Sequence, residues 1–191
     1  MKTTLIKLFA LASVVLFTGC AQLTMGAPQP TAENTANLKR ANLAETRLGS
    51  FSLEAGKPAQ MDKGHSLRGA NTVQAPTNGS FAEYVRESLR VELAAAGLLN
   101  SQADTVISGV LLDSQLDPAM GTGKGLIQVR FTVMKGTEKR YEKALTARSE
   151  WESSFVGAVA IPAAAQNYEG LYRKLVGQLI ADPDFRKALA K

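Results

Sequence analysis

The first twenty residues limit this chain most strongly, because they determine the compartment in which the rest of it folds. Lys2 and Lys7 form a short basic head, residues 5–17 form an apolar run whose only charge is Lys7, and two small residues lead to Cys20. This three-part pattern is typical of a secretory signal. The apolar run holds about 13 residues, whereas a membrane-spanning helix needs roughly 20. The pattern therefore predicts a signal peptide over residues 1–19, cleaved before Cys20, in preference to a spanning helix.

The residues before Cys20 resemble the lipobox of bacterial lipoproteins. That motif usually has leucine three residues before the cysteine, whereas this chain has Phe17 there and Leu16 one position earlier. The resemblance implies acylation of Cys20 with fatty chains such as palmitate, which would anchor the chain to a membrane. Ala21 follows the cysteine, where aspartate often signals retention in the inner membrane of enteric bacteria. By this resemblance we expect the periplasmic face of the outer membrane.

The composition after cleavage narrows the classes of ligand. Removal of residues 1–19 takes away two lysines and leaves a net charge of +3. This charge is too small to favour nucleic acid, which is also absent from the compartment of a lipoprotein. Cys20 is the only cysteine, so its acylation leaves no thiol for a disulfide or a catalytic nucleophile.

Residues 20–42 read as a spacer. They contain Gly26, Pro28 and Pro30 among small polar residues and show no helical or strand period. We expect a flexible tether between the lipid and the domain, with a packed N-terminal arm as the alternative. A single folded domain then spans residues 43–191, a length that suits one domain.

The domain is expected to open with a strand over residues 45–53, with a bulge or bend at Gly49. Residues 54–79 follow, with four glycines and two prolines. Glycine and proline interrupt regular elements, so we expect a long loop here. Loops of this length are usually functional or disordered.

This loop carries the only histidine of the chain, His65. A metal site needs three or four ligands, so we expect a solvated loop residue and no metal. Lys57, Lys63 and Arg68 make the loop weakly basic. These cations are candidates for contact with a partner or with lipid headgroups, and a solvated face is the alternative.

Residues 81–96 give the strongest helical pattern. Ser80 and Glu83 form a capping box at the start, and Gly97 provides the left-handed end. Apolar residues recur at steps of three and four, which predicts a stripe that faces the core. The stripe consists of Phe81, Val85, Leu89, Leu93 and Ala96.

Three strands are expected next. Residues 105–112 are apolar and β-branched, which predicts a central strand buried on both faces. Residues 126–134 alternate apolar and polar side chains, which indicates one buried and one wet face. A short turn containing Gly136 leads into a returning strand over residues 141–151, so this pair is expected to be antiparallel.

We do not interpret the turn between the first two of these strands as a nucleotide-binding site. Gly123 and Lys124 suggest a phosphate loop, but Pro118 stands where its first glycine belongs and Gly125 replaces its hydroxyl residue. The chain also lacks metal-ligand spacing, a nucleophile elbow and a Ser-His-Asp order. We therefore expect no cofactor and no small-molecule substrate.

The stretch from Trp151 to Tyr168 is the most unusual. It contains Phe155 and Pro162 and no charged residue after Glu152. Such a patch either packs on the sheet, which we favour, or stays open as a contact surface. A second helix with an apolar side at residues 168–179 follows, and Asp182-Pro183 opens a last short helical turn.

The order of elements predicts an α+β fold: a two-layer sandwich with a mostly antiparallel four-stranded sheet and two helices on one face. At this level the chain resembles the small outer-membrane lipoproteins of the YajG and LptE (lipopolysaccharide-assembly) type. The resemblance rests on the order of elements over residues 45–181 and on lipidation at Cys20, and on no diagnostic motif.

Three hypotheses for function follow. The leading one is a non-enzymatic, lipid-anchored envelope accessory protein that binds a protein partner through the surface 151–162 or the loop 56–79. The second, implied by the LptE resemblance, is a lipid or lipopolysaccharide binding or transport factor. The third, a periplasmic enzyme, lacks a catalytic set. Candidate partner-binding residues are Trp151, Phe155, Lys57, Lys63 and Arg68, and Lys124 joins the basic ones as a candidate phosphate contact.

Overall fold

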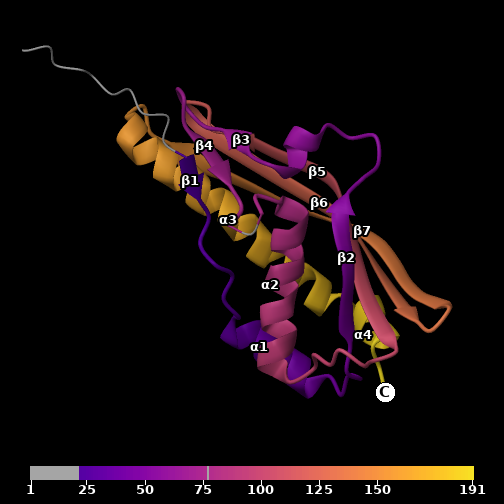
Figure 1. Cartoon of the computed structure of the whole chain (residues 1–191). Coiled ribbons are helices and arrows are strands. Elements are labelled where there is room, and N and C mark those ends of the chain that lie inside the picture. Colours follow the sequence, from indigo (N-terminus) through magenta and orange to yellow (C-terminus); the bar gives the residue numbers. More distant parts are fainter. Residues whose placement is uncertain (1–21, 77) are drawn as a thin grey trace, which may run out of the picture.

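The computed structural model of the chain describes residues 22–76 and 78–191 (Figure 1). The predicted signal peptide, residues 1–19, and the predicted lipidation site, Cys20, lie outside the described residues. In the described part, the main sheet has four strands in the order β2-β5-β6-β7. These strands and the two helices that cover the sheet are β2 (Arg47–Leu53), β5 (Thr105–Asp117), β6 (Gly121–Lys135), β7 (Glu138–Ser153), α2 (Phe81–Ala96) and α3 (Gly157–Ala181).

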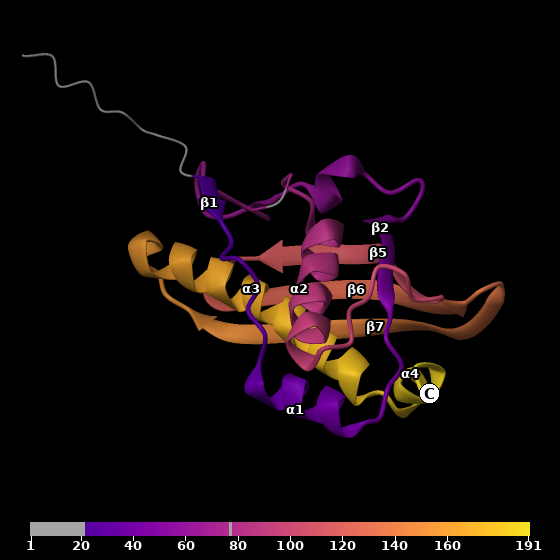
Figure 2. The same ribbon diagram turned by 60° about the horizontal axis from the view of Figure 1, so that its bottom comes forward.

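The layers match the predicted α+β sandwich. Helices α2 and α3 lie across the same face of the main sheet, α2 over β2 and β5 and α3 over β6 and β7 (Figure 2). β6 pairs antiparallel with both β5 and β7, whereas β2 pairs parallel with β5. The sheet is therefore mixed but mostly antiparallel, and its second face carries no helix in the described part of the chain.

The bulge expected at Gly49 is present in β2. The pairing of β2 with β5 shifts register between Leu48 and Phe51. Phe51 then lies over Gly109 of β5, where an added Cβ atom would come within 2.4 Å of the phenyl ring. The aromatic ring is thus accommodated because its partner in the central strand has no side chain.

Helix α2 forms as predicted. The backbone N–H of Glu83 donates to the Ser80 hydroxyl at 3.1 Å, and Gly97 ends the helix with φ of +74°. The N-cap bond satisfies one of the free amides of the first turn, and glycine takes the left-handed conformation without strain. Phe81, Val85 and Leu89 are buried, so the apolar stripe faces the core.

Helix α3 begins at Gly157, well before the expected residue 168, and it includes Pro162. Alanine-rich sequence favours a helix, although Pro162 removes the hydrogen bond to the carbonyl four residues earlier and its ring crowds that carbonyl. The short last helix, α4 (Pro183–Ala188), follows as predicted, because Asp182 caps it by accepting from the Asp184 N–H at 2.9 Å.

The central strand β5 is not buried on both faces, so that prediction is wrong. From Thr105 to Val110 its side chains alternate between buried and half-buried positions. The reason is that helices cover only one face of the sheet. The β-branched pattern reflected a central position in the sheet, not a covered second face.

The prediction of a flexible tether over residues 20–42 is wrong for residues 22–42. These residues form β1 (Gln22–Thr24) and α1 (Ala32–Arg40), and Met25 and Leu38 are buried in the core. The packed arm held as the alternative is therefore what the structure has. Glu92 of α2 holds this arm in place. Its carboxylate accepts hydrogen bonds from the Thr31 N–H at 3.0 Å and from the Asn34 side-chain amide at 2.9 Å.

The loop 54–79 also contains regular structure. It forms the short 3₁₀ helix η1 (Ala59–Asp62) and two strands, β3 (His65–Ser66) and β4 (Thr72–Gln74). β4 pairs antiparallel with β3 and parallel with β1, which makes a second sheet of three strands among the described residues. Segments distant in sequence meet here, so the pattern of either one alone could not reveal the pairing. None of the helices in the described ranges is both long and apolar enough to cross a membrane.

The packed arm gives a test of stability. Leu38→Ala removes a side chain that is 1% exposed, and we expect it to lower the free energy of unfolding by about 2 to 5 kcal/mol. Lys39→Ala, at the exposed neighbouring position, is the matched control and should change it by less than about 0.5 kcal/mol. Urea denaturation measures both. Equal, small effects would show that the arm contributes nothing to the fold.

Candidate functional site

His65 lies inside a cluster of polar and aromatic side chains, so the expectation of a solvated loop residue is wrong. Its Nε2 atom is 2.7 Å from the Ser114 hydroxyl and 3.0 Å from the Tyr168 hydroxyl. Its ring stacks on Phe81, with ring centroids 5.2 Å apart. Pairing of β3 with β4 places this ring over the start of α2, and the sequence around it carries no sign of that long-range contact.

The cluster is neutral at physiological pH. Burial lowers the pKa of His65 from 6.5 to about 4, and the nearby Asp113 carboxylate offsets only part of this effect. Burial raises the pKa of Tyr168, and its hydroxyl also receives a hydrogen bond at 3.0 Å from Tyr172. The imidazole and the hydroxyls therefore form a hydrogen-bonded chain without charge.

A serine beside a histidine is the arrangement of a nucleophile and a base, but here the serine is buried. Ser114 is 4% exposed and Tyr168 is fully buried. The serine hydroxyl is also hydrogen-bonded to the Tyr168 hydroxyl. The cluster thus holds β3, β5 and α3 together through side-chain hydrogen bonds.

The Arg68 side chain has a structural role. Its guanidinium donates to the carbonyl oxygens of Pro118, Ala119 and Ser154 and to the Ser153 hydroxyl. Four of its five N–H donors are thus used. The side chain ties the β3–β4 turn to the β5–β6 turn and to the segment between β7 and α3.

The other basic candidates do not converge on one phosphate site. Lys57 and Lys63 are exposed on either side of η1. Lys124 lies on β6 and is 3.6 Å from the Glu150 carboxylate of β7. With Arg68 occupied, the structure does not gather the cations that the sequence suggested for lipid phosphates.

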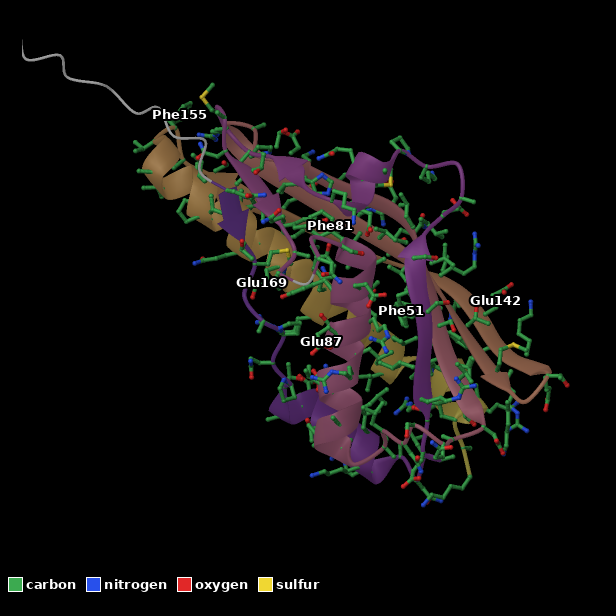
Figure 3. All side chains as sticks on the ribbon, in the orientation of Figure 1. Phe51, Phe81, Glu87, Glu142, Phe155 and Glu169 are labelled. Atoms are coloured by element: carbon green, nitrogen blue, oxygen red, sulfur yellow. The ribbon has the colours of Figure 1, made fainter. Side chains whose placement is uncertain are left out.

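The stretch after β7 divides into a packed part and an open part. Trp151 turns inward over Gly123, whose added Cβ atom would lie 2.3 Å from the indole. Phe155 points outward at one end of the molecule (Figure 3). We call the exposed apolar residues at this end the apolar tip: Met120, Phe155, Val156 and Val159, which are 65%, 79%, 60% and 58% exposed.

Met120 is not among the residues predicted from the sequence, because the β5–β6 turn has only the pattern of a glycine-rich turn. No local signal marks this residue as part of a patch. It joins the tip because Gly121 pairs with Ser153 across the sheet, which brings the turn next to Phe155.

The uncovered face of the main sheet has a hollow near the same end. Its volume is about 430 Å³. Half-buried Leu126 contributes apolar surface, and the exposed pair Lys124 and Glu150 contributes opposite charges at the rim. We call it the open-face hollow, and it is lined by Gln115, Leu116, Asp117, Lys124, Gly125, Leu126, Arg148, Ser149 and Glu150.

A larger hollow of about 520 Å³ lies at the opposite end, between the β6–β7 hairpin and α4. Charged side chains line most of it, including Lys143, which forms an ion pair at 2.8 Å with Asp182. Within the described ranges, no group of three His, Cys, Asp or Glu side chains is placed to hold a metal ion.

Comparison with known proteins shows the fold. Protein XCC0632 from Xanthomonas campestris, of the family model DUF330, is 9% identical with a TM-score of 0.56, over 84% of this chain and 92% of that chain. A putative lipoprotein from Caulobacter crescentus is 10% identical with a TM-score of 0.43, over 82% and 94%. A minor lipoprotein from Acinetobacter baumannii is 14% identical with a TM-score of 0.46, over 76% and 95%. No family model and no curated protein matches the sequence.

The His65 cluster makes stability depend on pH. Below pH 6.5 the unfolded chain protonates its histidine, while the folded chain does not until about pH 4, the pKa of half-buried His65. Proton binding therefore favours unfolding, and the free energy of unfolding should fall as the pH drops from 6.5 toward 4.5, by at most about 1.4 kcal/mol per pH unit. Since the chain has one histidine, His65→Gln should flatten this slope. Urea titrations across this pH range measure it, and an unchanged slope in the variant would contradict the assignment.

Proposed function

We propose that this chain is a lipid-anchored, non-enzymatic accessory protein of the bacterial cell envelope, and that it binds a protein partner through the open face of its main sheet. The observation that carries the proposal is the open-face hollow, a concave surface of mixed polarity on the uncovered face of the main sheet. Anchoring at Cys20, on the periplasmic face of the outer membrane, is the second part of the proposal.

The chemistry of the hollow suits a protein surface. Interfaces combine an apolar centre with a polar and charged rim. Half-buried Leu126 provides apolar surface, and exposed Gln115, Lys124 and Glu150 provide donors and acceptors beside it. Partner binding by the sheet also leaves the core unchanged, because the helices pack on the other face.

A role without catalysis is supported by the position of the one histidine. His65 is the strongest candidate for a general base in the sequence, yet it is hydrogen-bonded to two buried hydroxyls. A general base must reach a proton of the substrate, whereas the Nε2 atom of His65 is already engaged by the Ser114 and Tyr168 hydroxyls. The fold itself hosts many functions and does not decide this point.

Anchoring is supported by the sequence and by where the domain starts. Residues 1–19 have the three parts of a secretory signal before Cys20. The first described strand, β1, begins at Gln22, two positions after Cys20, so acylation would place the domain directly at the bilayer. Assignment to the YajG and LptE type remains a prediction within this proposal.

Photo-crosslinking in cells tests the partner. A photoreactive residue at Gln115, on the hollow, should capture an envelope protein. The same residue at Gln102, an exposed glutamine in the loop before β5, is the matched control and should capture none. Capture of lipopolysaccharide alone at Gln115 would favour the lipid-binding alternative. A hydrolase activity of the purified chain that His65→Ala abolishes would favour an enzyme.

Mass spectrometry tests the anchor. The mature chain should begin at an acylated Cys20, and Cys20→Ala should release the protein from the membrane fraction, because the acyl chains supply the membrane affinity. An unmodified amino terminus at Met1 in the soluble fraction would refute anchoring.

A further inference from the structure

The apolar tip concentrates exposed apolar surface at one end of the molecule. Five large apolar side chains are exposed among the described residues, and four of them belong to the tip. The segments that carry them are uncharged, since no Asp, Glu, Lys or Arg occurs at residues 118–123 or 153–168. A contiguous exposed apolar patch without charge marks a binding surface.

The tip is built as one rigid surface from two segments. Gly121, next to Met120, pairs with Ser153, two residues before Phe155. The Arg68 guanidinium donates to carbonyl oxygens in both segments, at Ala119 and Ser154. The patch therefore exists before any partner arrives, which lowers the ordering cost of binding.

The start of the domain lies beside this surface. Gln22 pairs with Thr72, and Thr72 pairs with Ser66, so β1 begins at the β3–β4 turn that contains Arg68. β1 runs parallel to β4, away from that turn. β1 therefore begins on the side of the turn, the same end at which α3 starts (Figures 1 and 2).

Only a short length of chain connects this end of the domain to an anchor at Cys20. Gln22 follows Cys20 by two positions, with only Ala21 between them, and two residue steps span at most about 7 Å when fully extended. An acylated cysteine lies at the surface of the bilayer, so the end of the domain that carries the tip must lie there too. No longer tether is available to lift it, because residues 22–42 are folded.

We propose that the apolar tip enters the interfacial region of the bilayer beside the acylated Cys20, so that the lipid surface is its ligand. This inference rests on the proposed anchoring. The transfer of phenylalanine, methionine and valine side chains from water to the boundary of headgroups and acyl chains lowers the free energy of the system. The two segments that carry the tip contain no charged residue, and the Arg68 guanidinium beside them is already hydrogen-bonded to their carbonyl oxygens, which limits the cost of removing charge from water.

Membrane contact at the tip also sets the orientation of the domain. Phe155 and Glu142 lie at opposite ends of the molecule (Figure 3), so the β6–β7 hairpin points away from the bilayer. The sheet then stands off the membrane, with its open face accessible from the periplasm. A freely rotating anchored domain would have no such preferred orientation.

Depth-dependent fluorescence quenching tests the proposal on the acylated full-length mature chain, reconstituted in vesicles of phosphatidylethanolamine and phosphatidylglycerol. Val156→Cys, in the tip, carries an environment-sensitive fluorophore. Glu142→Cys, an exposed position at the opposite end, is the matched control. Acylation consumes the only natural cysteine, so each variant has one reactive thiol. Spin-labelled lipids in the vesicles should quench the probe at residue 156 at least about threefold more than the probe at residue 142, because the tip reaches the lipid boundary.

Each of the remaining outcomes would overturn the proposal and show which of its premises is wrong. Chain that floats with the vesicles but shows equal, weak quenching at both positions would refute membrane contact of the tip and leave the anchor intact. A blue-shifted probe at residue 156 that spin-labelled lipids do not quench would show that a second copy or another protein covers the tip. Mature chain that does not float with the vesicles would refute the anchor itself, and the tip proposal with it.

Discussion

The close approach of α3 to the main sheet is the contact on which the rest of the structure depends. It requires small residues on β6: an added Cβ atom at Gly125 would lie 2.9 Å from Leu171 of α3, and one at Gly123 would meet the indole of Trp151. These glycines let the helix lie low over β6 and β7. The same contact buries Tyr168 completely and positions the start of α3 beside the β5–β6 turn.

A second set of contacts joins the small sheet to these layers. His65 connects β3 to β5 and α3 through two hydroxyls, and Arg68 connects the β3–β4 turn to the tip. Through Thr72 this sheet holds the first strand of the domain. The segment that looks like a loop in the sequence therefore fixes where the amino terminus of the domain lies, and with it the side from which an anchor must act.

Together these contacts separate three surfaces. The helices cover one face of the sheet, the other face is open and carries the hollow, and the apolar tip lies at the end where the chain enters the domain. In our proposals the tip meets lipid and the open face meets protein. The two roles are compatible, because the tip residues near the start of α3 are not among those that line the hollow.

The sequence by itself determined the features that depend on neighbours along the chain: the capped helix 81–96, the hairpin at Gly136, the last helical turn after Asp182, and the secretory pattern before Cys20. Periodicity and capping are local, so they can be read without a fold. From the elements they predict, the α+β class followed.

Only the tertiary structure decided the packed arm, the place of His65 in its cluster, the role of Arg68 and the membership of Met120 in the tip. Each depends on residues between about 30 and 100 positions apart that meet through strand pairing or, as His65 and Tyr168 do, through side-chain hydrogen bonds between elements. Such pairing is a property of the whole chain, because a polar or glycine-rich segment is ordered by what packs against it and not by its own composition.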